Sequence, residues 1–389
     1  MRILHVPPPL SRQGNTLMTV AEELGRQEIS RGDQVGVIVS HNRDARPAGL
    51  DNLIVDYTTY CPRQWFTANE VRLDTVAGRF GRRRRRTADL FLPAIDAAAA
   101  WQPDLVLLYE GVYAATSLPD WRRALPDASI VLYLHSALSR SYGRRELARV
   151  LDACDHVVCV SNFLRSATVA RVPEAAGKVT AVLNGVDLDT FRPAEPGAAG
   201  AAGDGVFSVL FAGQIAPHKG PDRLIRALGT AAALTDKPLR ATIVGSSAYD
   251  AGDQLTEYER SLRSLAKDSG AEVTFVPFVG RRELVELYRQ ASIVCMPSVF
   301  DDPFPLVALE AMACGTALVA SRRGGLTELG GDVAVFIDPD DIAGFGATLA
   351  DLAEHPEVVE TLGARSRDRL IGRTWQETNR RLVAVCEHR

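Results

Sequence analysis

The sequence contains no run of apolar residues that approaches the length of a membrane-spanning helix. It starts with a strand-like segment, Met1-Arg2-Ile3-Leu4, so we expect no signal peptide. Its six cysteines show no paired spacing, and four of them stand in apolar surroundings, as buried thiols do in a reducing compartment. These absences favour a cytoplasmic protein without structural disulfides.

A strong charge of one sign is also lacking. The formal net charge is −4 over 389 residues, which gives no general attraction to nucleic acid. The seven histidines show no zinc-ligand spacing. Two Asp-x-Asp pairs occur, at Asp187/Asp189 and Asp338/Asp340, and we interpret them as a helix start and a turn. We therefore expect no metal site.

What the sequence does contain is typical of a globular α/β protein. Hydrophobic residues make up 46% and charged residues 24%, and the length allows two domains with separate cores. Strand-like apolar runs alternate with helical segments, which predicts doubly wound parallel sheets. Expected elements in the first half are a helix over 16–31 and strands over 3–6, 35–39, 104–109, 130–135 and 156–160. Expected strands in the second half are 208–212, 241–244, 273–275, 293–296 and 317–320.

A Gly/Ala/Pro-rich stretch separates the two halves. It has little to bury, and we assign 188–205 as a flexible linker. The first domain is then 1–187 and the second 206–372. Two open α/β domains joined in this way are expected to enclose a ligand-binding cleft.

The segment 298–315 is the most informative part of the chain. Asp302 and Glu310 are eight residues apart, Pro305 suits the first helical position, and Gly315 suits a left-handed helix end. A carboxylate inside an apolar helix is seldom left without a partner, and its two oxygens suit the neighbouring hydroxyls of a ribose. Asp302 precedes the helix N-terminus, where amides attract anions. This pattern predicts a ligand with hydroxyls and negative charge.

A second phosphate-type signal follows the strand over 209–212. The loop from Gly213 to Pro221 leads into a helix and carries Lys219. Free amides and a lysine at such a junction can hold phosphate, although alone an exposed lysine is the simpler interpretation. Combined with the carboxylate helix some eighty residues later, the phosphate interpretation is favoured.

Four motifs therefore occur in a specific order: 184–187, 213–220, the pair Asp302 and Glu310, and 321–325. In this order and spacing they resemble the large retaining glycosyltransferase family 4, over nearly the whole chain. The resemblance implies a GT-B fold, which consists of two Rossmann-like domains facing a central cleft. It also implies that the final segment, about 373–389, is a helix that packs back on the first domain.

The resemblance further implies roles for single residues. Glu310 matches the glutamate that binds the donor ribose, Lys219 the lysine on the diphosphate, and His135 a histidine near the transferred sugar. Gly14 matches a glycine close to the donor phosphates. The implied catalytic residues are His135, Lys219 and Asp302. The implied donor-binding residues are Gly14, Gln214, Lys219, Phe304, Leu306, Val307 and Glu310.

Three positions depart from the family pattern. Asp302 stands where the family has glutamate, and is about 1.5 Å shorter. Gln214 replaces the arginine of a basic pair and brings no charge. Pro305 replaces a glycine whose amide faces the donor sugar, so one N–H is absent. We interpret this set as a modified donor preference, with reduced activity as the alternative.

The expected enzyme is hexosyltransferase-like. It would move a sugar from a nucleotide-diphosphate sugar to a hydroxyl of a small molecule, glycan or lipid-linked acceptor. Front-face displacement would retain the configuration, with no protein nucleophile, metal or cofactor besides the donor. One alternative is a nucleotide-sugar epimerase or phosphorolytic enzyme of the same architecture, which would need an added acid/base pair that we do not locate. The other is a sugar-nucleotide-binding protein whose catalysis has lapsed.

Two surface features add possible partners. The basic run Arg82–Arg86, followed by the apolar run 88–92, fits either a solvated loop or a peripheral contact with an acidic acceptor or the inner membrane face. Plausible acceptor-side residues in the first domain are Tyr60, Trp65, Phe66 and Glu110, although packing explains the aromatic ones equally well.

Overall fold

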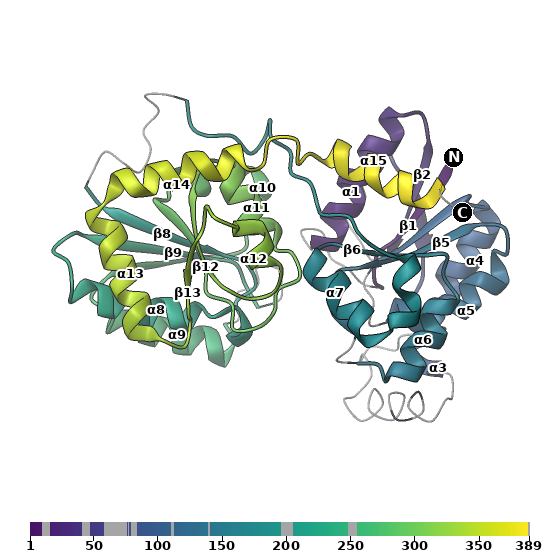
Figure 1. Cartoon of the computed structure of the whole chain (residues 1–389), viewed down its shortest axis with the longest axis horizontal. Helices are drawn as coiled ribbons and strands as arrows, with labels where there is room; N and C mark the ends of the chain where they lie inside the picture. Colours follow the sequence, from purple (N-terminus) through teal and green to yellow (C-terminus); the bar gives the residue numbers. More distant parts are fainter. Residues whose placement is uncertain are drawn as a thin grey trace. The chain divides into compact units, whose positions relative to one another are not determined.

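The computed structural model describes residues 1–9, 16–40, 47–57, 76, 78, 84–109, 113–138, 141–195, 205–247 and 255–387. The chain divides into two compact units (Figure 1). Unit 1 comprises Met1–Gly185 with Trp375–Arg389, and unit 2 comprises Val186–Thr374. Each unit is built around its own parallel sheet, which confirms the predicted α/β class.

Unit 1 contains a seven-stranded sheet in the order β3-β2-β1-β4-β5-β6-β7, and every neighbouring pair is parallel. Its strands are β1 (Arg2–Val6), β2 (Gln34–Ser40), β3 (Asp51–Val55), β4 (Leu105–Tyr109), β5 (Ser129–Leu134), β6 (His156–Cys159) and β7 (Val179–Ala181). Its helices are α1 (Thr16–Ser30), α3 (Arg85–Asp89), α4 (Leu92–Trp101), α5 (Ala114–Ala124), α6 (Arg144–Asp152), α7 (Asn162–Arg171) and α15 (Trp375–Glu387).

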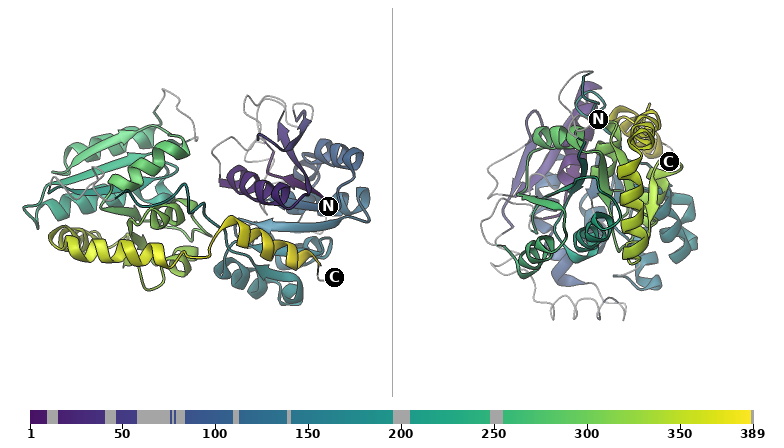
Figure 2. Two further views of the ribbon diagram at one scale, coloured as in Figure 1. Left: turned by 90° about the horizontal axis from the view of Figure 1, so that it is seen from above. Right: turned by 90° about the vertical axis from the view of Figure 1, so that its left-hand side faces the viewer.

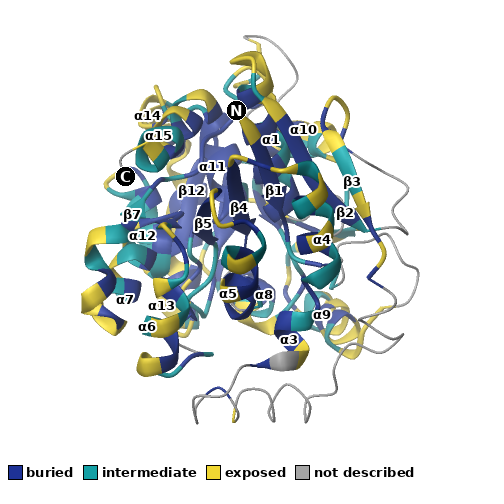
Figure 3. Cartoon of the chain, turned by 90° about the vertical axis from the view of Figure 1, so that its right-hand side faces the viewer, coloured by how far each residue is buried: buried dark blue, intermediate teal, exposed yellow. Residues whose placement is uncertain are grey.

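Helices cover both faces of this sheet (Figures 1 and 2). Both faces of a central strand are therefore buried, which is why β4 and β5 consist almost entirely of apolar residues. Figure 3 shows β1, β4 and β5 as buried, whereas α6 and α7 present exposed outer faces. The core of unit 1 thus lies on either side of these strands.

Unit 2 contains a six-stranded parallel sheet in the order β10-β9-β8-β11-β12-β13. Its strands are β8 (Phe207–Ala212), β9 (Leu239–Val244), β10 (Glu272–Val276), β11 (Ile293–Met296), β12 (Ala317–Ser321) and β13 (Val335–Ile337). Its helices are α8 (Pro221–Ala232), α9 (Glu257–Lys267), α10 (Arg281–Gln290), α11 (Leu306–Ala313), α12 (Gly324–Gly330), α13 (Ile342–Glu354) and α14 (Pro356–Asp368).

The segment assigned from sequence as a linker differs in its described part. Phe191 is fully buried in unit 2, and its carbonyl accepts a hydrogen bond from Arg367 at 2.6 Å. The described part of the segment is therefore attached to unit 2 through the Phe191 side chain and through the Arg367 guanidinium, which binds the carbonyls of Leu188 and Phe191. The unit boundary falls between Gly185 and Val186, two residues before the predicted one.

The last helix, α15, is grouped with unit 1 although it directly follows unit 2 in the chain. Its Thr378 hydroxyl donates to the Leu183 carbonyl at 2.9 Å, and Asn379 donates to Glu28 on α1 at 3.0 Å.

Of the cysteines in the described part, all are free and all but the partly buried Cys386 are buried. None of the described helices has both the length and the apolar character needed to cross a membrane.

Candidate functional site

The loops that follow β8, β11 and β12 lie side by side, because these three strands are neighbours in the sheet of unit 2. They comprise residues 213–220, 297–305 and 322–325. In an open α/β sheet, ligands usually bind at the carboxyl ends of the strands. The fold thus brings the motifs of the second half of the chain to one edge of the sheet.

Lys219 and Asp302 form an ion pair at this edge. Lys219 ends the short 3-10 turn Pro217–Lys219, and its Nζ donates to Asp302 Oδ2 at 2.6 Å. Asp302 is only 5% exposed, and the Lys219 Nζ also lies 4.8 Å from the centroid of the Phe300 ring. From sequence the two residues were expected to have separate roles, whereas in the structure they form one contact. The pairing follows from the adjacency of β8 and β11, which a linear sequence does not show.

Two glycines permit the close approach of these loops. Gly220 has φ +76°, and a Cβ there would lie 2.1 Å from the carbonyl oxygen of Pro297. A Cβ on Gly325 would lie 1.9 Å from the carbonyl oxygen of Pro303. The Gly325 N–H also donates to the Asp302 carbonyl at 2.7 Å. Any larger residue at either position would push the loops apart.

Helix α11 begins one residue later than predicted. Pro305 is its N-cap, with an extended conformation (φ −76°, ψ 121°), and its carbonyl accepts from the Leu309 N–H at 3.4 Å. Phe304 and Leu306 are buried and Val307 is half-buried. Pro305 supplies no side-chain cap. Because first-turn amides have no acceptor within a helix, those of Leu306 and Val307 are suited to an anion.

Glu310 is buried inside α11 and held by two side chains of α10. Its Oε2 accepts from the Tyr288 hydroxyl at 3.1 Å, and its Oε1 accepts from the Arg281 guanidinium at 3.3 Å. Burial, together with the Glu310 charge, raises the pKa of Tyr288 well above its ordinary value, so the hydroxyl stays a donor. The expectation that this carboxylate has partners is confirmed. Gly315, just after the helix, has φ +78° and ends it as predicted.

Gln214 lies in the loop after β8 but is turned to a neighbouring loop. Its Nε2 donates to the Ser247 carbonyl at 3.0 Å. Its side chain is therefore engaged within the protein, and it brings no charge to the edge of the sheet.

Two buried hydroxyls complete this edge. The Oγ atoms of Ser298 and Ser321, which follow β11 and end β12, have no hydrogen-bond partner within the described ranges. A buried hydroxyl without a partner carries a free-energy cost of about 1–3 kcal/mol. Both are thus donors suited to a ligand with phosphate or hydroxyl oxygens.

The Asp-x-Asp pairs form turns. Asp338 Oδ1 accepts from the Asp340 N–H at 3.1 Å, as expected for a turn. Asp187 Oδ1 accepts from the N–H groups of Asp189 and Thr190, which makes a turn where a helix start was predicted. Over the described residues there is no cluster of three or more His, Cys, Asp or Glu side chains that could hold a metal ion.

His135 lies in unit 1, directly after β5. Its ring stacks on Tyr109 (centroids 5.6 Å apart, 21° between planes) and contacts Tyr133 at 4.6 Å. Its Nε2 is buried and has no hydrogen-bond partner among the residues that the structure describes. Desolvation lowers the pKa of His135 to about 3, so the ring is neutral near pH 7. Gly14, Tyr60, Trp65, Phe66 and Glu110 lie outside the described residues.

The basic run Arg82–Arg86 is not a uniform surface loop. Arg84 is 6% exposed and donates to Glu146 from both Nε (2.7 Å) and NH2 (2.8 Å), while its guanidinium lies over Tyr142. It is buried because this bidentate pair compensates its charge. Leu90 and Phe91 of the adjoining apolar run are also buried in the core. The prediction that the run as a whole is solvated or membrane-facing is therefore wrong for Arg84 and for these two residues.

Sequence reasoning missed the residues that hold the predicted ones. Arg281 and Tyr288 are seven residues apart on α10, which places them on one helix face, and this spacing was a usable signal. The hydroxyls of Ser298 and Ser321 gave no such signal, because their burial depends on the order of the strands.

Two family models match the chain in succession. The model described as Glycosyltransferase Family 4 matches residues 16–190, and the model described as Glycosyl transferases group 1 matches residues 199–369. Both halves of the chain are thus similar to glycosyltransferase domains.

The chain is similar in sequence to proteins from bacteria. The chain is 35% identical over 246 residues to the D-inositol 3-phosphate glycosyltransferase of Saccharomonospora viridis, covering 61% of this chain and 56% of that protein. It is 27% identical over 286 residues to spore coat protein SA of Bacillus subtilis, covering 69% and 75%. The match to the first relative spans about half of its length.

Solved structures share the fold over the whole chain. Sucrose-phosphate synthase from Thermosynechococcus elongatus has a TM-score of 0.76 at 17% identity, covering 99% of this chain and 98% of that one. Anabaena HepE in complex with UDP and glucose has a TM-score of 0.74 at 18% identity, with both chains fully covered. These similarities establish the fold.

Proposed function

The chain belongs to glycosyltransferase family 4 and has the GT-B fold, and from this we propose that it transfers a sugar from a nucleotide-diphosphate sugar to a hydroxyl acceptor with retention of configuration. Unit 2 would bind the donor. We further propose that no metal ion takes part.

The observation that carries the proposal is the arrangement at the carboxyl ends of β8, β11 and β12. A lysine and a carboxylate are paired at 2.6 Å, and the uncapped first turn of α11 follows. The buried Glu310 lies farther along the same helix. Cation and amides suit a diphosphate, and a fixed carboxylate suits two ribose hydroxyls.

The chemistry that these groups support is electrostatic. As the bond to the sugar breaks, negative charge grows on the diphosphate, and Lys219 with the first-turn amides of α11 would stabilise it. The acceptor oxygen would bond to the anomeric carbon on the face from which the diphosphate leaves. A phosphate oxygen of the donor would take the acceptor proton, so neither a protein nucleophile nor a protein base is required. Asp302, once Lys219 turns to the diphosphate, would be available to sugar hydroxyls.

The nucleotide of the donor is to be identified by experiment. Uridine is the first to test, because the similar HepE structures hold UDP or UDP-glucose. A thermal-shift screen of UDP-, GDP-, ADP- and dTDP-sugars should reveal one nucleotide that raises the melting temperature, since a ligand stabilises the state that binds it. Transfer or slow donor hydrolysis is then measured with that donor.

Lys219→Ala tests the proposed role directly. It should lower turnover about a hundredfold or more, because the lysine faces charge that develops in the transition state. Arg240→Ala is a matched loss of one cation and should leave turnover unaltered, because Arg240 is a partly exposed residue of β9 that is paired with Glu272. Near-normal turnover of Lys219→Ala would contradict the assignment.

Two other functions give different outcomes in the same assays. A nucleotide-sugar epimerase would convert one donor into another without acceptor. A binding protein whose catalysis has lapsed would show the thermal shift with neither transfer nor hydrolysis. Gln214, which brings no charge, is the observation that favours the second alternative.

A further inference from the structure

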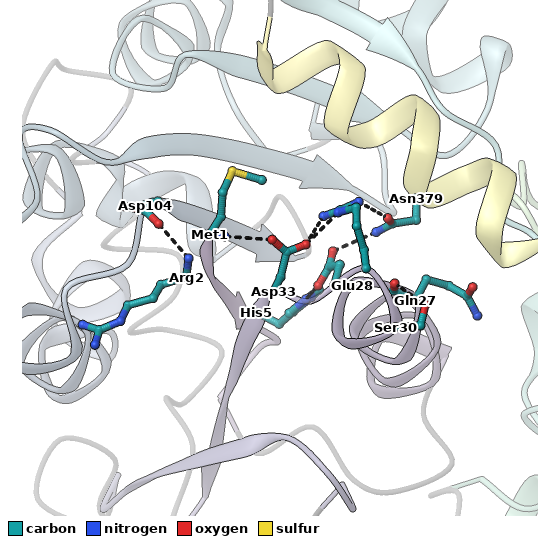
Figure 4. Close-up of polar contacts among 10 residues, drawn as sticks. Met1, Arg2, His5, Gln27, Glu28, Ser30, Asp33, Asp104 and Asn379 are labelled. Atoms are coloured by element: carbon teal, nitrogen blue, oxygen red, sulfur yellow. Dashed lines mark hydrogen bonds and ion pairs between the residues drawn. The ribbon is translucent and has the colours of Figure 1, made fainter.

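A buried chain of polar side chains runs through unit 1 from the last helix to the central strands. It links Asn379 on α15, Glu28 on α1, His5 on β1 and Tyr109 on β4, which are 3%, 1%, 0% and 0% exposed. Figure 4 shows Glu28 between His5 and Asn379. Burial on this scale is tolerated only when each polar atom has a partner.

The direction of each hydrogen bond in this chain is fixed by chemistry. A carboxylate only accepts, so Glu28 takes one bond from Asn379 Nδ2 at 3.0 Å and one from His5 Nε2 at 2.7 Å. Arg31 donates to Asn379 Oδ1 at 2.6 Å, which fixes the orientation of that amide. Asn379 is thus one of the two side chains seen to donate to Glu28.

Tyr109 is the next residue in this chain of hydrogen bonds. In the tautomer whose proton lies on Nε2 and is directed to Glu28, Nδ1 of His5 is an acceptor, and the Tyr109 hydroxyl lies 2.7 Å away. Burial raises the pKa of Tyr109 well above its ordinary value, so the hydroxyl keeps the proton that it donates. The orientation of the Tyr109 ring is therefore set by His5.

Tyr109 in turn supports His135. Their rings stack with centroids 5.6 Å apart and 21° between planes, and Tyr133 packs against the same imidazole. His135 Nε2 has no hydrogen-bond partner in the described part of the chain. Ring contacts with the two tyrosines, rather than a hydrogen bond at Nε2, hold this side of the imidazole.

We propose that Asn379 is a positioning residue, which orders Glu28 and His5 so that Tyr109 holds His135 in its working orientation. The inference rests on the proposed function, in which His135 acts near the transferred sugar. It makes the last helix, which directly follows unit 2 in sequence, part of the apparatus of unit 1.

The test exchanges donor and acceptor at one contact. Asn379→Asp places a carboxylate against Glu28, and Glu28→Gln places an amide donor against other donors. The double change Glu28→Gln with Asn379→Asp restores the order, because the new amide donates to the new carboxylate while its oxygen still accepts from His5. The exchange leaves shape and net charge nearly unaltered.

Two readouts are taken on the full chain. In NMR spectra of histidine-labelled protein, with the His135 ring signal assigned by His135→Gln, each single change should shift that signal and the double change should return it. In the transfer assay each single change should lower kcat about tenfold with the donor KM unaltered, as expected for a displaced group, and the double change should restore it.

Thr378→Val is the matched control. Thr378 is equally buried on α15, but its hydroxyl donates to the Leu183 carbonyl outside the chain of contacts. This change should lower the melting temperature without moving the His135 signal. If a single change at Asn379 or Glu28 prevents folding, Tyr109→Phe, which keeps the ring and removes its hydroxyl, must move the His135 signal.

Three results would overturn the proposal: an unmoved His135 signal in the single variants, a double variant worse than either, or an equal shift in Thr378→Val. The NMR readout does not depend on catalysis. If the unaltered chain transfers no sugar, the proposed function fails, while the His135 signal still decides whether Asn379 positions the ring.

Discussion

The Lys219–Asp302 pair alters the charge that a donor would meet. Lys219 is paired with a carboxylate at 2.6 Å, and Gln214 of the same loop is uncharged and donates to the Ser247 carbonyl. A diphosphate therefore has to draw the lysine away from Asp302, or share it. The aspartate is one methylene shorter than the family's glutamate and is also engaged with the cation, so one of the three departures lies directly in this contact.

The donor preference should respond to restoring the family residues. Asp302→Glu with Pro305→Gly returns carboxylate reach and one N–H, and the extended conformation of Pro305 is open to glycine. We expect the kcat/KM ratio to shift toward UDP-glucose, UDP-N-acetylglucosamine or GDP-mannose by about ten- to a hundredfold, the value of one regained polar contact. Each single change is measured beside the double change. An unaltered kcat/KM ratio in all three variants would mean that other residues select the donor sugar.

Glu310 gives a prediction for the nucleotide. Glu310→Gln should leave the fold intact and weaken nucleotide binding by about 1–3 kcal/mol, since a charged acceptor is lost. Calorimetry with the identified nucleotide measures it. Glu286→Gln, an exposed carboxylate on α10 paired with Arg289, is the control and should bind normally. Equal affinity for both variants would remove Glu310 from the site.

His135 makes stability depend on pH. Its folded-state pKa of about 3 lies below the ordinary 6.5, so between these values the unfolded chain binds a proton that the folded chain does not. Stability is therefore complete above pH 6.5 and falls as the pH decreases toward 3. Between about pH 7.5 and pH 4.5, the melting temperature of His135→Asn should therefore decrease less than that of the unaltered chain.

His355 serves as a control, because its effect on stability changes with pH in the opposite direction. Its hydrogen bond to the Asp351 carbonyl raises its pKa, so its contribution is present below the ordinary 6.5 and is lost as the pH rises through the folded value. His355→Asn should therefore not flatten the acid-side loss. Identical pH profiles for His135→Asn and the unaltered chain would contradict a lowered pKa of His135 in the folded state.

At the scale of elements, the central strands were predicted from sequence and three edge strands were not. β4, β5, β8, β11 and β12 read as apolar runs because both of their faces are covered. β3, β7 and β13 are the strands that the sequence analysis left out. Each forms an edge of its sheet and is partly exposed. β3 and β7 contain polar residues, whereas the segment 333–337, which includes β13, is a continuous apolar run and was a usable signal.

For the candidate site, the residues could be predicted from sequence but their contacts could not. Lys219, Asp302 and Glu310 could be selected from sequence, since charge beside glycine and within an apolar helix is unusual. Their contacts could not, because the ion pair depends on β8 lying next to β11, and the Glu310 partners depend on how α10 packs.

The junction of α3 and α6 gives a prediction about stability. Arg84→Met leaves the Glu146 carboxylate buried without its bidentate partner, which should lower the free energy of unfolding by about 3–5 kcal/mol. Arg86→Met, an exposed residue of α3 two positions after Arg84, should change it by less than about 0.5 kcal/mol. Denaturation monitored in unit 1 measures both. Similar small losses would show that Arg84 is not a structural tie.

At the scale of the whole molecule, each unit combines a parallel sheet with functional groups at strand ends, yet the two differ in kind. Unit 2 presents cations, helix amides and hydroxyls, which suit an anionic donor. Unit 1 presents a neutral imidazole between two tyrosines, with no charge of its own near pH 7. These chemistries support the proposal that unit 2 binds the donor.

Metal dependence tests how the whole chain supplies charge to the diphosphate. Lys219, the first-turn amides of α11, and Arg323, which donates to the Val299 carbonyl at 3.0 Å in the adjoining loop, are positive groups of the protein itself. We expect full transfer activity after EDTA treatment and no gain from added Mg²⁺ or Mn²⁺. Activity that vanishes with EDTA and returns with either ion would mean that a cation takes the role given to Lys219. In that case Lys219→Ala should cost far less than a hundredfold at saturating metal, so that the two measurements together identify which positive charge the reaction uses.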